Sequence, residues 1–304
     1  MTEEGRKQKA EGRSGSARRR GWLRYFCLLP SAFCLVTAAQ AQDARYTPLT
    51  PIPLGDTYLS LPSSHIAGDG SWEVKFTHRF NQSLDQGSFS DRLHSLWGLD
   101  SNADVGIGIS YAVRRDLQFS FYRSNALDDI ELAAKYIVVQ QAPALPFSVA
   151  LRGGADFRTE REIVDRHSLF AQAIVSHQFG KRAEIFAIPT FVTDAGRAVS
   201  GDQSTALFSN AFNVPVGFAW VLTDALSIVG EVIPTNRDLP NDFHADLGWA
   251  IGLKRAIGGH YFEILITNSN ATHADQYVTS TYMGSPLNKS NLHLGFNIER
   301  RFGR

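Results

Sequence analysis

The stretch that decides the fold is the C-terminal one, NLHLGFNIERRFGR (residues 291–304), in which apolar and polar side chains alternate. One face would carry Leu292, Leu294, Phe296, Ile298 and Phe302, and the other His293, Gly295, Asn297 and Glu299. A period of two is typical of a β-strand whose two faces meet different surroundings. We therefore expect residues 291–302 to form a full two-faced strand.

The same alternation recurs along the chain and predicts eleven more strands. They are expected at 72–80, 103–113, 117–124, 130–139, 147–158, 169–179, 184–192, 208–222, 225–233, 245–255 and 260–267. The pattern is irregular in 169–179 and 184–192, where Phe170, Ile174, Phe186 and Ile188 put apolar groups on the expected polar face. The register of these two strands stays open.

The links between the predicted strands differ systematically in length. Links after even-numbered strands are short and lie at 114–116, near Pro143, and at 180–182, 223–224 and 257–259. Most links after odd-numbered strands are long and lie at 81–102, 159–168, 193–207, 234–244 and 268–290. Short turns at one end and longer loops at the other are typical of outer-membrane barrels, whereas a soluble β-sandwich predicts no such asymmetry. The predicted fold class is all-β, a transmembrane antiparallel up-and-down β-barrel of about 12 strands over residues 71–304. Closure would pair residues 291–302 with 72–80.

The N-terminus has the pattern of a secretory signal peptide over residues 1–41. An arginine-rich start is followed by an apolar run at 25–39 and by Ala39-Gln40-Ala41. The run is too short for a membrane-spanning helix, which is the alternative. Export predicts a location in the bacterial outer membrane, with residues 42–70 as a periplasmic N-terminal segment. Both cysteines, Cys27 and Cys34, would be removed.

Three stretches resemble a bacterial family of membrane-bound β-barrel domains of unknown function (domain-of-unknown-function family 5777). They are LWGLDSNADVGIGISYAVRRDLQFSFYRS, NVPVGFAWVLTDALSIVGEVIP and GGHYFEILITNSN, within a likeness that covers about residues 58–302. The resemblance implies a barrel and a membrane, and it assigns no residue roles. The last strand also resembles the signal read by the outer-membrane assembly machinery, although Gly303 and Arg304 follow its aromatic Phe302.

Charged side chains on the inward face are the candidate lumen lining. They are Glu73, Lys75, Arg79, Asp104, Glu131, Lys135, Arg152, Asp156, Arg158, Glu231, Asp246, Lys254, Glu263 and Glu299. Because acids and bases nearly balance, they could form a salt-bridge network that fills the barrel, or they could line a pore. Inward glycines such as Gly106 and Gly295 would leave open space or make room for a plug. Candidate plugs are the 81–102 loop and residues 42–70.

The predicted function is a pore or small-solute transporter in contact with outer-membrane lipid. A non-conducting scaffold barrel that anchors a partner is the alternative, and a membrane-embedded lipid hydrolase is a third possibility without a G-x-S-x-G motif. No cofactor or metal is expected, since no HExxH motif or i, i+4 histidine pair occurs. Removal of residues 1–41 leaves 22 basic and 27 acidic residues, which disfavours nucleic-acid binding.

The alternation makes a direct prediction about stability. Ile107→Arg and Leu294→Arg should each lower the free energy of unfolding by about 2–4 kcal/mol, because both side chains would face lipid. Asp104→Asn and Gly295→Ser, on the lumen face, should have milder effects. Urea titration of the refolded barrel in lipid vesicles measures the difference, and equal losses on both faces would contradict the assigned faces.

Overall fold

A computed structural model describes residues 49–160, 167–195, 210–234, 247–278, 281–282, 285–286 and 292–303. The first half of the barrel contains β1 (Trp72–Phe80), β2 (Ala103–Arg114), β3 (Leu117–Ser124), β4 (Asp129–Val139), β5 (Ser148–Arg158) and β6 (His167–Phe179). The second half contains β7 (Ala183–Ala187), β8 (Thr190–Thr193), β9 (Asn210–Asn213), β10 (Val216–Thr223), β11 (Leu226–Ile233), β12 (Gly248–Ile257), β13 (His260–Thr267) and β16 (His293–Phe302). The links carry α2 (Phe89–His94), η2 (Leu96–Gly98), η3 (Ala126–Asp128), α3 (Ala274–Tyr277), β14 (Thr281–Tyr282) and β15 (Ser285–Pro286).

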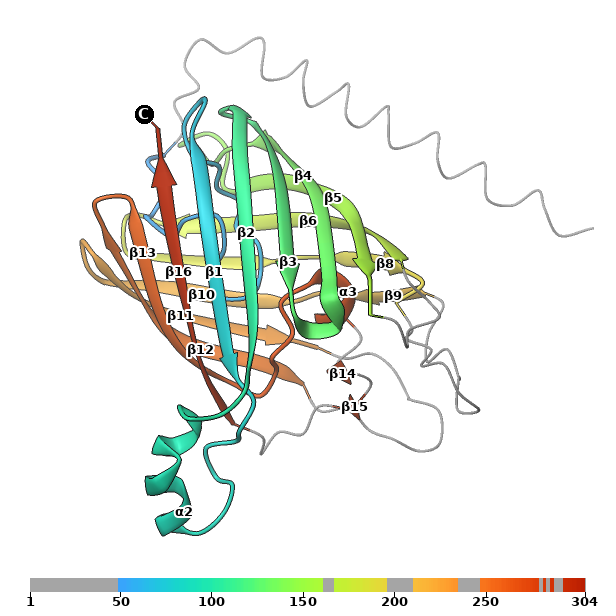
Figure 1. Ribbon diagram of the computed structural model, residues 1–304. Helices are drawn as coiled ribbons and strands as arrows, with labels where there is room; N and C mark the ends of the chain where they lie inside the picture. The colour runs from blue at the N-terminus through green and yellow to red at the C-terminus, as the bar shows by residue number, and fades with distance from the viewer. Residues whose placement is uncertain are drawn as a thin grey trace, which may run out of the picture. The chain divides into compact units, whose positions relative to one another are not determined.

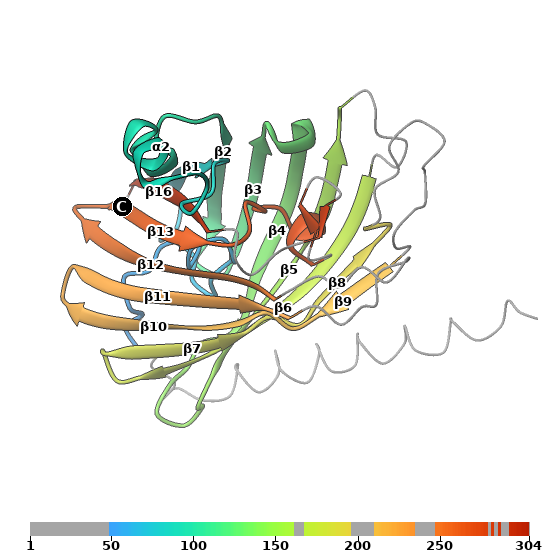
Figure 2. The same cartoon turned by 90° about the horizontal axis from the view of Figure 1, so that it is seen from below.

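The large sheet closes on itself into the barrel seen in Figures 1 and 2. Its 14 strand segments pair antiparallel in one series, and the additional pairing of β5 with β6 joins the series into a ring. The C-terminal strand β16 lies between β13 and β1, and Phe76 of β1 is opposite Ile298. The predicted pairing of 291–302 with 72–80 is confirmed, so no strand edge is left unpaired at this junction.

Two of the twelve strands are each interrupted at a proline. Pro189 separates β7 from β8, and Pro215 separates β9 from β10, because proline has no N–H to give to the ladder. The carbonyls of both prolines still accept backbone hydrogen bonds, from Ala173 at 3.0 Å and from Ile188 at 2.7 Å. The prolines therefore distort the wall without opening it, and the predicted number of twelve strands is confirmed.

The two faces of the wall differ as the alternation predicts. In β2, Ile107 and Ile109 are exposed on the outside, while Gly106, Gly108 and Ser110 point inward and are buried. The outer band of large apolar side chains continues around the barrel, for example at Leu132 and Ile264. No helix in the described part of the chain combines the length and apolar character needed to cross a membrane.

The strands whose register the sequence left open turn apolar side chains into the lumen. Phe170, Ile174, Phe186 and Ile188 are all buried, and none is more than 4% exposed. The inward face is therefore mixed, with polar groups along β1–β5 and an apolar area on β6 and β7. An apolar area inside a barrel needs a partner to cover it.

The inward glycines are covered by neighbouring side chains, so they do not open the lumen. A Cβ atom on Gly295 would lie 2.8 Å from Cδ of Arg79 and 2.9 Å from the carbonyl oxygen of His78. A Cβ atom on Gly106 would overlap the hydroxyl oxygen of Tyr122. These positions make room for large lumen side chains, and Gly295→Ser is therefore no mild control for the lipid-facing variants.

This crowding predicts different effects of alanine substitution at two glycines of the wall. Gly295→Ala should lower the free energy of unfolding by about 1–3 kcal/mol, because an added methyl overpacks a filled site. Gly153→Ala, whose Cβ would meet nothing closer than a backbone oxygen at 3.5 Å, should be nearly neutral. Urea titration of both refolded variants measures the contrast, and a neutral Gly295→Ala would show that Arg79 can move aside.

Candidate functional site

Residues 52–65, called the plug here, run through the interior of the barrel. Leu54, Tyr58, Leu59 and Leu61 are each no more than 1% exposed. In Figure 2 this blue segment lies within the ring of strands. Of the two plug candidates, the N-terminal one thus occupies the lumen over residues 52–65, whereas residues 42–48 lie outside the described part. The other candidate, the 81–102 loop, does not, since its helix α2 has no buried residue.

Acidic side chains on one wall hold the plug by its backbone and hydroxyl groups. The Glu231 carboxylate of β11 accepts the backbone N–H groups of Leu59 at 2.8 Å and of Ser60 and Leu61 at 3.1 Å. On β16, the Glu299 carboxylate accepts the hydroxyl of Thr57. Charged acceptors make these bonds roughly twice as strong as neutral ones.

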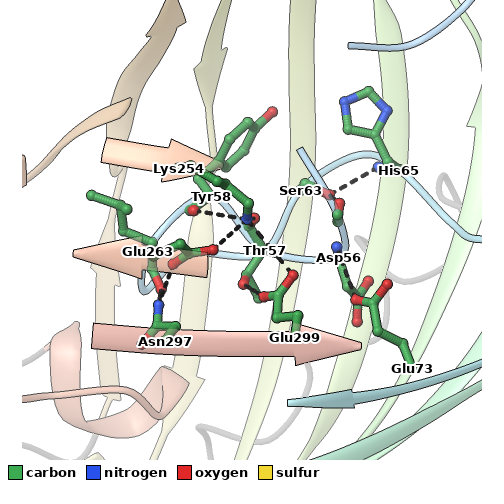
Figure 3. Close-up of polar contacts among 12 residues, drawn as sticks. Asp56, Thr57, Tyr58, Ser63, His65, Glu73, Lys254, Glu263, Asn297 and Glu299 are labelled. Carbon is green, nitrogen blue, oxygen red and sulfur yellow. Dashed lines mark hydrogen bonds and ion pairs between the residues drawn. The ribbon is translucent and has the colours of Figure 1, made fainter. Parts of the chain in front are cut away.

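Lys254 of β12 holds the same turn of the plug from its carbonyl side (Figure 3). Its ammonium donates to the carbonyl oxygens of Thr57 at 2.6 Å and Tyr58 at 3.2 Å, and it pairs with Glu263 at 2.5 Å. The plug turns sharply at Gly55, whose φ is +74° and whose added Cβ would overlap a carboxylate oxygen of Glu299. Only glycine combines that backbone conformation with so close an approach to the wall.

The apolar side of the plug covers the apolar area of β6 and β7. The ring of Tyr58 stacks on Phe186, with centroids 3.6 Å apart and planes 7° from parallel. Its hydroxyl donates to Glu184 at 2.5 Å, and His65 contacts the same carboxylate at 3.2 Å. Burial, together with the Glu184 charge, raises the pKa of Tyr58 well above its usual value, so the phenol stays a donor. The apolar Phe186 on the inward face of β7 thus has a cause, the packing of Tyr58 of the plug.

Asp56 joins the plug to the opposite, more basic wall. Its carboxylate pairs with Lys135 of β4, and its backbone N–H donates to Glu73 of β1 at 3.1 Å. Burial raises the pKa of Asp56, but the charge and hydrogen bond of Lys135 and the charges of Lys75 and Arg152 together outweigh burial, so the pKa is lowered. Lys135 also donates to the carbonyl of Ser63 at 3.2 Å, so it binds both ends of the plug's turn.

A second insert, residues 268–278, enters the barrel from the long-loop end. Its Asp275 pairs with Arg158 at 3.0 Å, and both side chains are fully buried. Tyr277 of α3 accepts a hydrogen bond from Gln172 at 2.6 Å, and Thr272 accepts one from Tyr122 at 3.0 Å. The sequence analysis missed this insert, because its small and polar residues have no periodicity that separates it from an outer loop.

Thirteen of the fourteen predicted lumen residues belong to the described part of the structure. Asp246 lies outside the described residues, and the others lie on the inner wall, where all are buried except the half-buried Lys75 and Arg152. Several pair with a group outside the predicted set, such as Arg79 with Asn297 at 2.7 Å. Sequence analysis also missed Arg301, which pairs with Glu73 at 3.0 Å, and Glu184. Both lie on the inward parity of strands that the alternation identified.

The space between the plug and the basic wall is small and polar. A cavity of about 50 Å³ is lined by residues that include Lys75, Lys135, Arg152, Gln118 and Ser110. Within the described residues, no group of three or more His, Cys, Asp or Glu side chains is arranged to hold a metal ion.

A closed antiparallel ring with an apolar outer band and charged, buried side chains within defines a membrane β-barrel. The chain belongs to the family described as a membrane-bound beta barrel domain (DUF5777), whose model matches residues 55–302. The resemblance seen in the sequence is thereby confirmed. No curated protein matches the chain.

Three solved outer-membrane proteins are similar to this chain, and each shares about one identical residue in ten with it. The NanC porin is 10% identical, with a TM-score of 0.47, over 77% of this chain and 100% of its own. Omp33 of Acinetobacter baumannii is 10% identical, with a TM-score of 0.39, over 77% and 99%. An outer membrane channel from Pseudomonas putida F1 is 10% identical, with a TM-score of 0.45, over 84% and 100%.

The hold of Glu231 on the plug can be tested by amide exchange. In Glu231→Ala, hydrogen–deuterium exchange at Leu59, Ser60 and Leu61 should accelerate at least about tenfold, because hydrogen bonds to a charged group contribute roughly 1.5–3 kcal/mol each. Mass spectrometry of the protein in detergent measures the rate. Glu160→Ala, in the loop after β5, is the matched control. Unchanged exchange in Glu231→Ala would mean that apolar packing alone holds the plug.

Proposed function

We propose that this protein is an outer-membrane channel for small polar solutes that its own plug holds closed. The observation that supports this most directly is that side chains of the wall, and not backbone strand pairing, bind the plug. The backbone hydrogen bonds of residues 52–65 in the described structure stay within the plug, between Leu54 and Ile52, Tyr58 and Leu61, and Ser63 and Asp56. The plug can therefore leave the lumen without breaking any backbone hydrogen bond between the strands of the barrel.

The closed state is the stable one in this proposal. Withdrawal of the plug would expose several apolar side chains, each of which contributes about 1.5–3 kcal/mol when fully buried. It would also leave Glu231 and Lys254 without the backbone groups that they bind now. The second insert narrows the other half of the lumen and stays in place in this proposal, so passage depends on movement of the plug. Conduction is expected as rare events.

The proposed location rests on the membrane-barrel family and on the asymmetry of the links. Short turns such as those at 115–116 and 258–259 share one end of the barrel with the C-terminus (Figure 1). That arrangement suits a barrel inserted from the periplasm. The signal peptide over residues 1–41 lies outside the described residues and stays a prediction, as does the expectation that the protein is not an enzyme.

A reversible lock on the plug tests the function. The hydroxyl oxygens of Ser64, in the plug, and Ser176, on β6, lie 2.8 Å apart, so cysteines at both positions should form a disulfide. In planar bilayers, oxidised Ser64→Cys/Ser176→Cys should show no conductance steps. Reduction by dithiothreitol should restore the rare steps of the wild-type protein, and deletion of residues 52–65 should make them frequent.

The single variants Ser64→Cys and Ser176→Cys, treated with the same oxidant, are the controls. A heat-modifiability gel confirms that each barrel is folded before recording. Equal conductance in the oxidised and reduced double variant would show that ions pass without plug movement. Silence of the folded plug-deleted barrel would contradict the channel itself.

A scaffold role is the second candidate, and the β1–β2 link favours it. Within eleven residues this link exposes Phe89, Leu93, Leu96, Trp97 and Leu99, and the side chain of Phe89 is 71% exposed. The helix α2 is stabilised by a reciprocal capping box between Ser88 and Asp91, so Phe89 and Leu93 are presented on a formed helix, and Leu96, Trp97 and Leu99 lie in and after η2. This role would be favoured if the barrel conducts no ions after deletion of its plug and if Phe89→Ser/Leu93→Ser abolishes binding of a partner protein.

A further inference from the structure

Three cations gather on one wall of the lumen, beside the plug. Lys75 comes from β1, Lys135 from β4 and Arg152 from β5, and all three line the cavity of about 50 Å³. Two of them have carboxylate partners, since Lys135 pairs with Asp56 and Arg152 with Glu131. Arg152 also donates to the side-chain oxygen of Gln172 at 2.8 Å, which orients the guanidinium along the wall.

Lys75 differs from the other two cations. Its ammonium lies over the ring of Tyr122, 4.6 Å from the centroid, and within the described chain no carboxylate lies within 4.0 Å of it. A half-buried cation without an anion is unfavourable unless water or a ligand compensates it. Lys75 therefore brings an unmatched positive charge to the edge of a polar cavity.

Asp56 shows where an anion is stable on this wall. The structure places the Asp56 carboxylate against Lys135. Burial raises the pKa of Asp56, but interactions with Lys135, Lys75 and Arg152 lower the pKa, and together they outweigh burial. All three cations thus favour a negative charge at this point. Asp56 is supplied by the plug, so the charge departs whenever the plug does.

The remaining acids of the cavity cannot replace Asp56. Glu73 is paired with Arg301 at 3.0 Å, and Glu131 is paired with Arg152. Withdrawal of the plug would therefore leave Lys135, like Lys75, without a carboxylate within 4.0 Å. The amide of Gln118 and the hydroxyls of Ser110 and Ser120 line the same cavity and can donate hydrogen bonds to an incoming anion.

We propose that Lys75, Lys135 and Arg152 form a binding site for the carboxylate of a small organic acid, and that Asp56 of the plug occupies this site in the closed barrel. The inference names the solute class of the proposed channel and rests on that function only for transport. Solute and plug compete for the same cations. Because Asp56 is tethered, its effective concentration is high, and a free acid binds the wild-type protein weakly.

Calorimetric titration with succinate, against sodium chloride of equal ionic strength, tests the site in the folded full-length barrel in detergent. Asp56→Asn removes the competing charge and keeps the side chain's shape, so it should bind succinate at least tenfold more tightly than the wild type. Adding Lys75→Gln or Lys135→Gln to Asp56→Asn should abolish the gain. Adding Lys181→Gln, in the exposed β6–β7 turn, lowers the net charge equally and should preserve it.

Equal succinate affinity of Asp56→Asn and the wild type would overturn the proposal, as would a gain that survives Lys75→Gln and Lys135→Gln. A heat-modifiability gel verifies folding, and Asp56→Ser serves if Asp56→Asn does not fold. A further measurement needs no change at Asp56: succinate should raise the frequency of wild-type conductance steps at least threefold over chloride, and Lys75→Gln should remove this effect.

The two proposals fail in different ways. A barrel that conducts after plug removal but shows no gain in succinate binding would keep the channel and reject the carboxylate site. A barrel in which Asp56→Asn binds succinate, but which stays silent without its plug, would keep the site and reject the channel.

Discussion

The need to neutralise charges inside a narrow barrel is the constraint on which the rest of this structure depends. A buried ion is costly unless it is paired and hydrogen-bonded, and a twelve-stranded wall brings many ionisable side chains into one interior. Pairs within the wall, such as Arg152 with Glu131, meet part of this need. The plug and the second insert meet much of the rest, through contacts such as Asp56 with Lys135 and Asp275 with Arg158.

The plug is complementary to a lumen with two unlike walls. It presents N–H and hydroxyl donors toward Glu231 and Glu299, an anion toward Lys135, and an aromatic ring toward Phe186. Such a match explains why one short segment can close the barrel without strand pairing. In the proposed channel, a solute that displaces the plug must therefore offer comparable chemistry to the wall.

The outer face obeys a simpler rule than the lumen. Lipid supplies no hydrogen bonds, so every backbone group must be paired within the wall and every second side chain must be apolar. The carbonyls of Pro189 and Pro215 remain in the ladder for the same reason. The exposed apolar patch after β1 departs from this rule, because it lies beyond the strands, on the capped helix α2 and on the residues in and after η2. It is the surface on which a partner would be sought.

Sequence alone determined the strands, the faces of all but those at 169–179 and 184–192, and the closure of the last strand on the first, because an alternation of period two is a local signal. It also placed residues such as Lys135, Arg158 and Glu231 on the inner wall from parity. Only the tertiary structure decided what those residues touch. The Asp56–Lys135 and Asp275–Arg158 pairs join segments that are 79 and 117 residues apart, and no periodicity encodes such distances. Residues 42–70 were one of two candidate plugs in the sequence, but the apolar Phe186 and Ile188 on the expected polar face were explained only when the tertiary structure placed Tyr58 of the plug against Phe186.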